Sequence, residues 1–212
     1  YIPRMLSKSR YNRRLHRIQH LVQMVFSILG ELWKAYNLEK RYIIDTFPVA
    51  VCDNYRIPRA KIYQKESYRG YISSKKRYFY GLKIHVLVTE TGQPVEFFLT
   101  PGSYSDGGGL RRFEFDLPRG STIYADKAYT NYLIEDLLDE ASDIQLSPFR
   151  KKNSKRPVPP WVHYLQHAYR KMIETAGSVI NGLFPKSIHA VTSAGFELKV
   201  GLFLLAYSFM SF

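Results

Sequence analysis

The chain has 212 residues, which is enough for one domain with a substantial core and a small appendage. Its 31 lysines and arginines against 18 aspartates and glutamates give a net charge of +13, which favours a polyanionic partner, although a ribosome-associated or simply basic protein has the same balance. Cys52 is the only cysteine, so an internal disulfide and a zinc site built from several cysteines are excluded, and a reducing cytoplasm is the expected location.

The N-terminal segment is predicted to be helical over residues 7–38. Its apolar residues recur every three or four positions, as on one face of a helix: Leu15, Ile18, Leu21, Val22, Val25, Phe26 and Leu29. It could be the tail of an N-terminal module packed on the main domain or a dimerisation helix. Because the chain begins at Tyr1 and not at a methionine, we expect it to be a fragment whose upstream segment is missing. Residues 1–40 would then be the helical remnant of an N-terminal module, and residues 41–212 the main domain.

The first predicted strand carries an acid. Tyr42, Ile43 and Ile44 precede Asp45, and Pro48 should limit how far the strand continues as a central one. A carboxylate in such an apolar run is costly unless it is paired, hydrogen-bonded or bound to a metal.

Residues 54–77 are predicted to be irregular and basic. Tyrosines alternate there with basic residues, which suits either stacking on nucleic-acid bases or a solvated loop with a few packed rings; composition slightly favours the loop. The tyrosines are Tyr55, Tyr63, Tyr68 and Tyr71. A hairpin should follow, with strands at residues 78–89 and 94–100.

A second strand that ends on an acid is predicted at residues 121–125. Asp126 comes directly after this strand. Before the strand, a short helix is expected to begin near Ser105 or Asp106, and its three glycines do not form a phosphate-binding loop. On this motif alone, Asp126 could equally cap the helix that starts near Thr130 or bind a ligand at the carboxyl end of the strand. Because Asp45 lies in the same kind of place, a shared cation is the favoured interpretation.

The C-terminal part should contain a strand at residues 143–149, a basic loop at 150–160, a helix from Trp161 to about residue 182, and an apolar helix at 197–210. The last helix is shorter than the roughly 20 residues that a membrane span needs, so we expect it to be buried in the protein.

Glu174 lies in the Trp161 helix, where it could pair with Arg170 in solvent or lie beside the face packed on the sheet. The predicted fold is a mixed α/β sheet, antiparallel in its first three strands and then parallel, flanked by helices.

Four motifs together resemble bacterial insertion-sequence transposases with an Asp-Asp-Glu triad and an RNase H-like core. The motifs are IIDTFPV, YGLKIHVLVT, YADKAY, and RKMIETAGS followed by IHAVTSAGFELK. The chain looks closest to the nine-eight-two insertion-sequence family, and the resemblance covers nearly everything from residue 7 onwards. It implies that the catalytic and metal-binding residues are Asp45, Asp126 and Glu174.

The resemblance also implies the chemistry. Two Mg²⁺ or Mn²⁺ ions would support DNA cleavage and strand transfer, with Asp45 bridging both ions, Asp126 binding one and Glu174 the other. DNA would be the partner, a homodimer would bring two DNA ends together, no membrane would be involved, and the protein would join the nucleoid when bound to DNA. Asp53 and Asp106, both expected in loops, are rival acids.

Candidate DNA contacts are the basic residues near these motifs and in the basic loop, and His85 is a further candidate beside the active site. For each of them an exposed or core-satisfied side chain is an equally good explanation. The candidates are Lys75, Lys76, Arg77, Lys83, Lys127, Arg150, Lys151, Lys152, Lys155, Arg156 and Arg170.

Two other functions stay open from the sequence. The related transposases often carry an aromatic and a basic residue where this chain has Gly177 and Asn181, which favours a catalytically inactive, DNA-binding remnant as the alternative. A nuclease of the same fold, which hydrolyses DNA without joining strands, is the third possibility.

Overall fold

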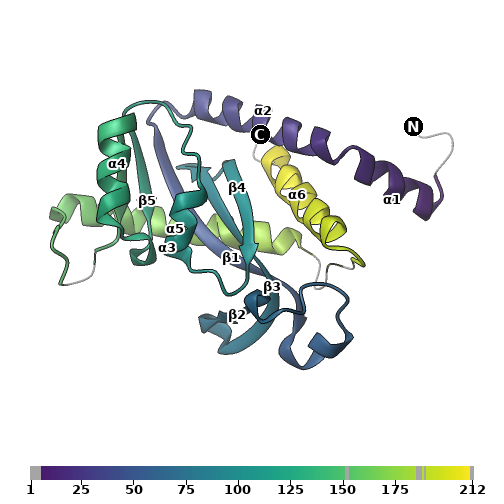
Figure 1. Ribbon diagram of the computed structural model, residues 1–212. Coiled ribbons are helices and arrows are strands. Elements are labelled where there is room, and N and C mark those ends of the chain that lie inside the picture. The colour runs from purple at the N-terminus through teal and green to yellow at the C-terminus, as the bar shows by residue number, and fades with distance from the viewer. Residues whose placement is uncertain (1–5, 151–152, 185–187, 189, 211–212) are drawn as a thin grey trace.

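A computed structural model describes residues 6–150, 153–184, 188 and 190–210 (Figure 1). Its centre is a six-stranded mixed sheet with β2, β3, β1, β5 and β6 side by side in that order, and with β4 also paired to β3. The strands are β1 (Arg41–Asp53), β2 (Arg69–Ile72), β3 (Arg77–Thr89), β4 (Pro94–Pro101), β5 (Ser121–Ala125) and β6 (Ile144–Pro148).

The pairing follows the predicted pattern. β1, β3 and β4 form antiparallel pairs, whereas β5 and β6 run parallel to β1. The mixed sheet flanked by helices is therefore confirmed. β2 was not predicted, because its four residues lie in the basic stretch without an apolar alternation.

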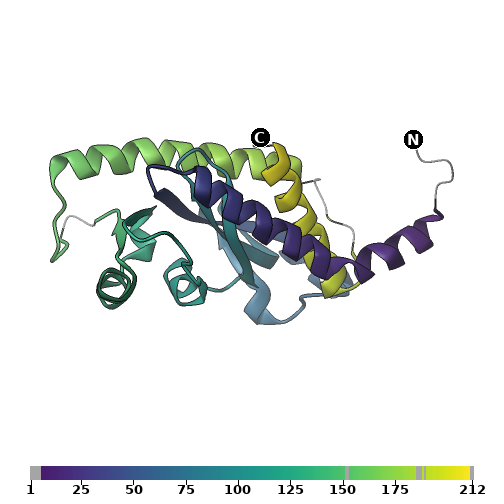
Figure 2. The same cartoon turned by 90° about the horizontal axis from the view of Figure 1, so that it is seen from above.

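Helices cover both faces of the sheet (Figure 2). One core contains residues of α5 and α6 packed on side chains of one sheet face, such as Ile43 and Ile84, and the other contains Ile44, Ile123 and Leu110 beside α3 and α4. The helices are α1 (Lys8–Arg17), α2 (Gln19–Tyr36), α3 (Asp106–Gly109), α4 (Tyr132–Ser142), α5 (Pro160–Leu183) and α6 (Ser193–Met210).

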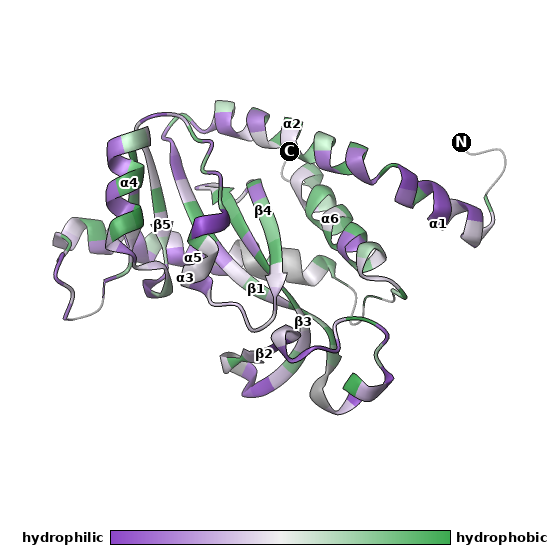
Figure 3. Cartoon of the chain, viewed as in Figure 1, coloured by the Kyte–Doolittle hydropathy of each residue, from purple (hydrophilic) through white to green (hydrophobic). Residues whose placement is uncertain are grey.

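The single N-terminal helix that the sequence predicted is two helices. The backbone of Ile18, at φ −99° and ψ 13°, separates α1 from α2. α2 packs along β4 and α6 through Phe26, Leu29 and Trp33, and the indole Nε1 of Trp33 donates to Ser208 Oγ at 2.9 Å. α1 buries none of its described residues and is largely hydrophilic (Figure 3).

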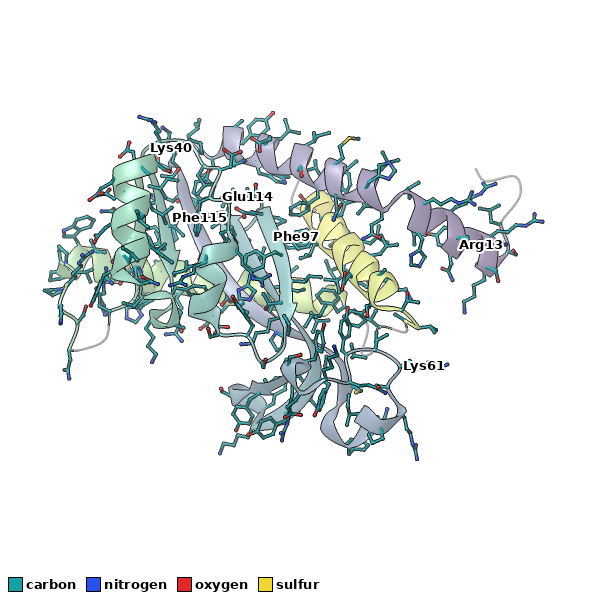
Figure 4. All side chains as sticks on the ribbon, in the orientation of Figure 1. Arg13, Lys40, Lys61, Phe97, Glu114 and Phe115 are labelled. Atoms are coloured by element: carbon teal, nitrogen blue, oxygen red, sulfur yellow. The ribbon has the colours of Figure 1, made fainter. Side chains whose placement is uncertain are left out.

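The apolar C-terminal helix α6 packs against the sheet. Phe196, Val200 and Leu204 are fully buried in the core, and Phe97 of β4, labelled in Figure 4, belongs to the same cluster. By length and composition alone, α6 is the one helix in the described part of the chain that could cross a membrane, with 39% of it buried. A core helix of this composition meets the same criterion, and the packing of α6 agrees with the predicted burial.

Pro48 lies where β1 has a neighbour on one side only, in agreement with the expectation that it limits how far the strand continues as a central one. It pairs with Lys83 in the middle of a 13-residue strand. The parallel neighbour β5 pairs with β1 only as far as Ile44, so the proline lies where its missing N–H disrupts no bond to β5.

The tyrosines of residues 54–77 divide between the two interpretations. Tyr63 is buried and Tyr68 packs against the core, as expected for a loop with packed rings. Tyr55 and Tyr71 are exposed, at 73% and 48%.

Candidate active site

The ends of β1 and β5 bring two aspartates together. Ile44 and Ala125 form the last register pair of these parallel strands, and the next residue of each chain segment is Asp45 or Asp126. Because residues in register on parallel strands share a face, both carboxylates extend toward the same side of the sheet. α5 packs against both strands there.

A pocket of about 110 Å³ joins these aspartates to the third acid of the predicted triad. Several water molecules fit in such a volume. Its walls come from β1, β5, the end of β6 and α5, and comprise Ile43, Ile44, Asp45, Tyr124, Ala125, Asp126, Phe149, Gln166, Arg170 and Glu174.

The pocket is unfavourable for the Asp45 carboxylate. Burial raises the pKa of Asp45 to about 7, the backbone N–H of Thr46 opposes this rise, and the negative charges of Asp106, Asp126 and Glu174 add to it. Such a crowded set of acids is stabilised by a bound cation.

Asp126 does not cap the next helix. Asn131 is the N-cap residue of α4, and its side chain accepts a hydrogen bond from the backbone N–H of Ile134 at 3.3 Å. Within the described residues, the buried Oδ1 of Asp126 has no hydrogen-bond partner. The capping interpretation is therefore wrong.

Glu174 lines the pocket but points its charge to solvent. Its side chain is 66% exposed and accepts a hydrogen bond from Arg170 Nε at 3.2 Å. Glu174 therefore both pairs with Arg170 in solvent and lies beside the packed face of α5, the two positions that the sequence allowed. No three His, Cys, Asp or Glu residues of the described ranges form a cluster that could hold a metal ion. In this state, the two aspartates adjoin and the glutamate is held by Arg170.

Gln166 is a pocket residue that the sequence analysis did not identify. It is fully buried, and its Nε2 lies within 3.2 Å of Ser147 O, Ser147 Oγ and Pro148 O. Its Oε1 is buried without a partner among the described residues. The signal was the spacing, because Gln166, Arg170 and Glu174 recur every four residues and so share a helix face.

The rival acids do not lie in loops. Asp53 is the last residue of β1, and Asp106 is the first residue of α3. Asp106 pairs with Lys83 Nζ at 3.0 Å, which leaves it beside the pocket as a charged neighbour of Asp45.

His85 is a core residue. It is fully buried, with Nδ1 2.9 Å from Thr46 Oγ1 and Nε2 2.9 Å from Thr100 Oγ1, and Thr46 also contacts the Tyr129 hydroxyl. Its ring stacks on Phe98. Burial lowers the pKa of His85 to about 4, so the ring is neutral at pH 7.

The candidate DNA contacts fall into two groups. Arg150 forms two bonds with Glu135, of 2.9 and 2.6 Å, in a pair that is almost fully buried, so it already has a structural role. Arg156 pairs with Asp136, and Lys83 and Arg170 pair as described above. The exposed candidates are Lys75, Lys76, Arg77, Lys127 and Lys155, whereas Lys151 and Lys152 lie outside the described residues.

The comparison with protein families gives the class of this chain. A family model described as the transposase DDE domain matches residues 35–185, and the chain belongs to this family. No curated protein and no solved structure matches the chain. The predicted resemblance to Asp-Asp-Glu transposases is thereby confirmed at the level of the family, and DNA is the substrate that this family implies.

Proposed function

We propose that this protein is a DNA transposase of the nine-eight-two type with an RNase H-like core. It cleaves DNA at the ends of its mobile element and joins the 3′ ends to target DNA, through Asp45, Asp126 and Glu174. The observation that carries this proposal is the pocket that Asp45, Asp126 and Glu174 all line, from β1, the end of β5 and α5. The strand order supports the proposed core, because two parallel strands extend an antiparallel set of three.

The pocket residues fit divalent cations. Carboxylate oxygens are the ligands that Mg²⁺ and Mn²⁺ prefer, Asp126 Oδ1 has no partner within the described chain, and Asp45 lies among three other acids. Asp45 would hold two ions, Asp126 one of them and Glu174 the other. When bound, the two ions activate the attacking oxygen and stabilise the leaving oxygen of the phosphodiester.

Arg170 connects DNA binding to the position of Glu174. In the described part of the chain the guanidinium makes an exposed ion pair with Glu174, which is worth little in water, and lies 5.8 Å from the centroid of the Phe149 ring. A DNA phosphate at the mouth of the pocket competes for Arg170 and so releases Glu174 to turn inward. Substrate would thereby complete the acidic set.

The test is cleavage of labelled element-end DNA with Mg²⁺ or Mn²⁺ by Asp45→Asn, Asp126→Asn and Glu174→Gln. Each variant should lose at least about 100-fold in cleavage rate, as happens when one group is removed from a set that stabilises developing charge. DNA affinity measured in EDTA should stay near that of the wild type. Asp139→Asn, which changes an exposed acid of α4, is the matched control. Wild-type cleavage by either aspartate variant would overturn the triad.

A catalytically inactive DNA-binding remnant is the second candidate, because Glu174 is exposed and paired with Arg170. Under this alternative, binding is salt-sensitive and independent of Mg²⁺ and Mn²⁺, and no product forms.

A joining assay separates the transposase from a nuclease, which yields only hydrolysed ends. As a transposase, the protein would work in the cytoplasm, on the nucleoid, as a homodimer that holds two DNA ends.

A further inference from the structure

A second, open groove of about 480 Å³ lies between the β2–β3 hairpin and the turn that follows β4. The hairpin projects beyond the rest of the sheet, at the bottom of the view in Figure 1. Residues that line the groove include Arg69, Tyr71, Tyr78, Lys83, Tyr104 and Asp106. Its volume is in the range of sites that hold a small organic group.

The floor of the groove carries two exposed aromatic rings. Tyr71 and Tyr78 are cross-strand partners with ring centroids 4.9 Å apart, and each is 48% exposed. The guanidinium of Arg69 lies 4.3 Å from the centroid of the Tyr78 ring. Exposed rings beside a stacked arginine are the usual means by which proteins hold unpaired bases.

The charge around the groove is suited to phosphates. Lys75 and Lys76 are exposed in the turn of the hairpin, and the Arg112 guanidinium lies 5.1 Å from the centroid of the Tyr104 ring. The nearby acids are already paired, Glu66 with Arg69 at 2.8 Å and Asp106 with Lys83 at 3.0 Å. A nucleotide chain along the groove would therefore meet unbalanced positive charge.

The groove adjoins the candidate active site. Ala128, in the turn directly after Asp126, forms part of its wall, and so does Asp106, whose charge acts on Asp45. A strand that leaves the carboxylates can thus enter the groove. Paired bases are stacked inside a duplex and cannot offer their faces to a tyrosine, so the ligand must be unpaired.

We propose that this groove binds an unpaired stretch of DNA next to the cleavage point, with a base stacked on the Tyr71–Tyr78 pair and phosphates held by the lysines of the hairpin turn. The inference rests on the proposed function, and it identifies the form of DNA that the site accepts. A single strand should accordingly bind more tightly than a duplex of the same length.

The test uses the full chain in EDTA, so that no reaction occurs, with an oligothymidylate that carries one 2-aminopurine. Tyr71→Leu and Tyr78→Leu keep apolar side chains on the strands but lose the ring, and each should weaken binding about 5-fold to 150-fold, the range measured for single stacking residues. Tyr71→Phe and Tyr78→Phe should bind like the wild type. The matched control is Tyr36→Leu, since Tyr36 is exposed at the end of α2.

Stacking also has a spectroscopic signature that a merely structural defect does not reproduce. Quenching of 2-aminopurine should occur with the wild type and the phenylalanine variants and be lost with the leucine variants. Affinity within twofold of the wild type in both leucine variants, or equal affinity for duplex and single strand, would overturn the proposal. Binding in EDTA reports on the groove, whereas metal-dependent cleavage by Asp45→Asn reports on the triad, so a failed triad and a failed groove give different results.

Discussion

At the scale of residues, the carboxylate pocket contains polar atoms that the chain itself does not satisfy. Asp126 Oδ1 and Gln166 Oε1 belong to pocket residues, and both are buried without partners among the described residues. A buried acceptor without a partner costs about 1–3 kcal/mol. The Gln166 amide nitrogen lies within 3.2 Å of three oxygens of β6, to which its two N–H groups can donate, and this fixes the orientation of its oxygen. We interpret these atoms as acceptors for water or a hydrated cation.

His85 gives the protein a pH-dependent stability. Its pKa is about 4 in the folded protein and near 6.5 when unfolded, so the unfolded state takes up the proton first as the pH falls. The stabilisation is present above pH 6.5 and is lost between pH 6.5 and 4. Denaturant unfolding should show a loss of up to about 3 kcal/mol over this range.

His85→Gln is the variant that tests this dependence, because an amide can still bond to Thr46 and Thr100 but does not titrate. Its unfolding free energy should change less between pH 6.5 and 4 than that of the wild type. Equal pH slopes for the two proteins would show that His85 is not the responsible group.

At the scale of elements, an ion pair attaches α4 to the end of β6. Arg150 and Glu135 are almost fully buried, so removal of one partner leaves a buried charge. Glu135→Ala should lower the free energy of unfolding by about 3–5 kcal/mol, measured in denaturant. The neighbouring pair of Arg156 and Asp136 is exposed, and Asp136→Ala should cost less than about 1 kcal/mol. Similar losses in both variants would contradict the structural role of Arg150.

The strands could be predicted from the sequence because their apolar runs end at clear turns. β5 and β6 fall within the predicted segments, β3 and β4 exceed theirs by one residue, and β1 continues well beyond the predicted Tyr42–Ile44. The acids Asp45 and Asp126, which follow two of the apolar runs, were visible in their motifs. The parallel register of β1 and β5 then brings these acids together. β2 could not be predicted, since its pairing with β3 depends on a tertiary contact and not on its own composition.

The third side of the pocket depends on the rotation of α5 about its axis. The sequence allowed Glu174 either to pair with Arg170 or to lie beside the packed face, and it does both. Burial of Gln166 and Tyr169 sets the rotation of the helix, and the four-residue spacing shows which residues share a face but not which face packs on the sheet. The break at Ile18 was likewise invisible, because the apolar period continues through it.

At the scale of the whole molecule, helices cover both faces of the sheet, and the pocket lined by Asp45, Asp126 and Glu174 lies where β1 and β5 meet α5. α5 and α6 cover one face, α3 and α4 the other, and α2 lies along β4 (Figures 1 and 2). Exposed basic side chains lie on different parts of this scaffold, such as Arg13 on α1, Lys40 just before β1 and Lys61 in the loop after β1 (Figure 4). The net charge of +13 therefore extends over the molecule and suits a long polyanion.

The most direct measurement for the carboxylate pocket is Mn²⁺ binding by isothermal titration calorimetry on the wild type, Asp45→Asn, Asp126→Asn and Asp139→Asn. The proposed site predicts saturable binding to the wild type and to Asp139→Asn, and affinity lowered at least tenfold in the two pocket variants. Binding that is equal in all four proteins, or absent from the wild type both with and without DNA, would contradict a metal site at Asp45 and Asp126.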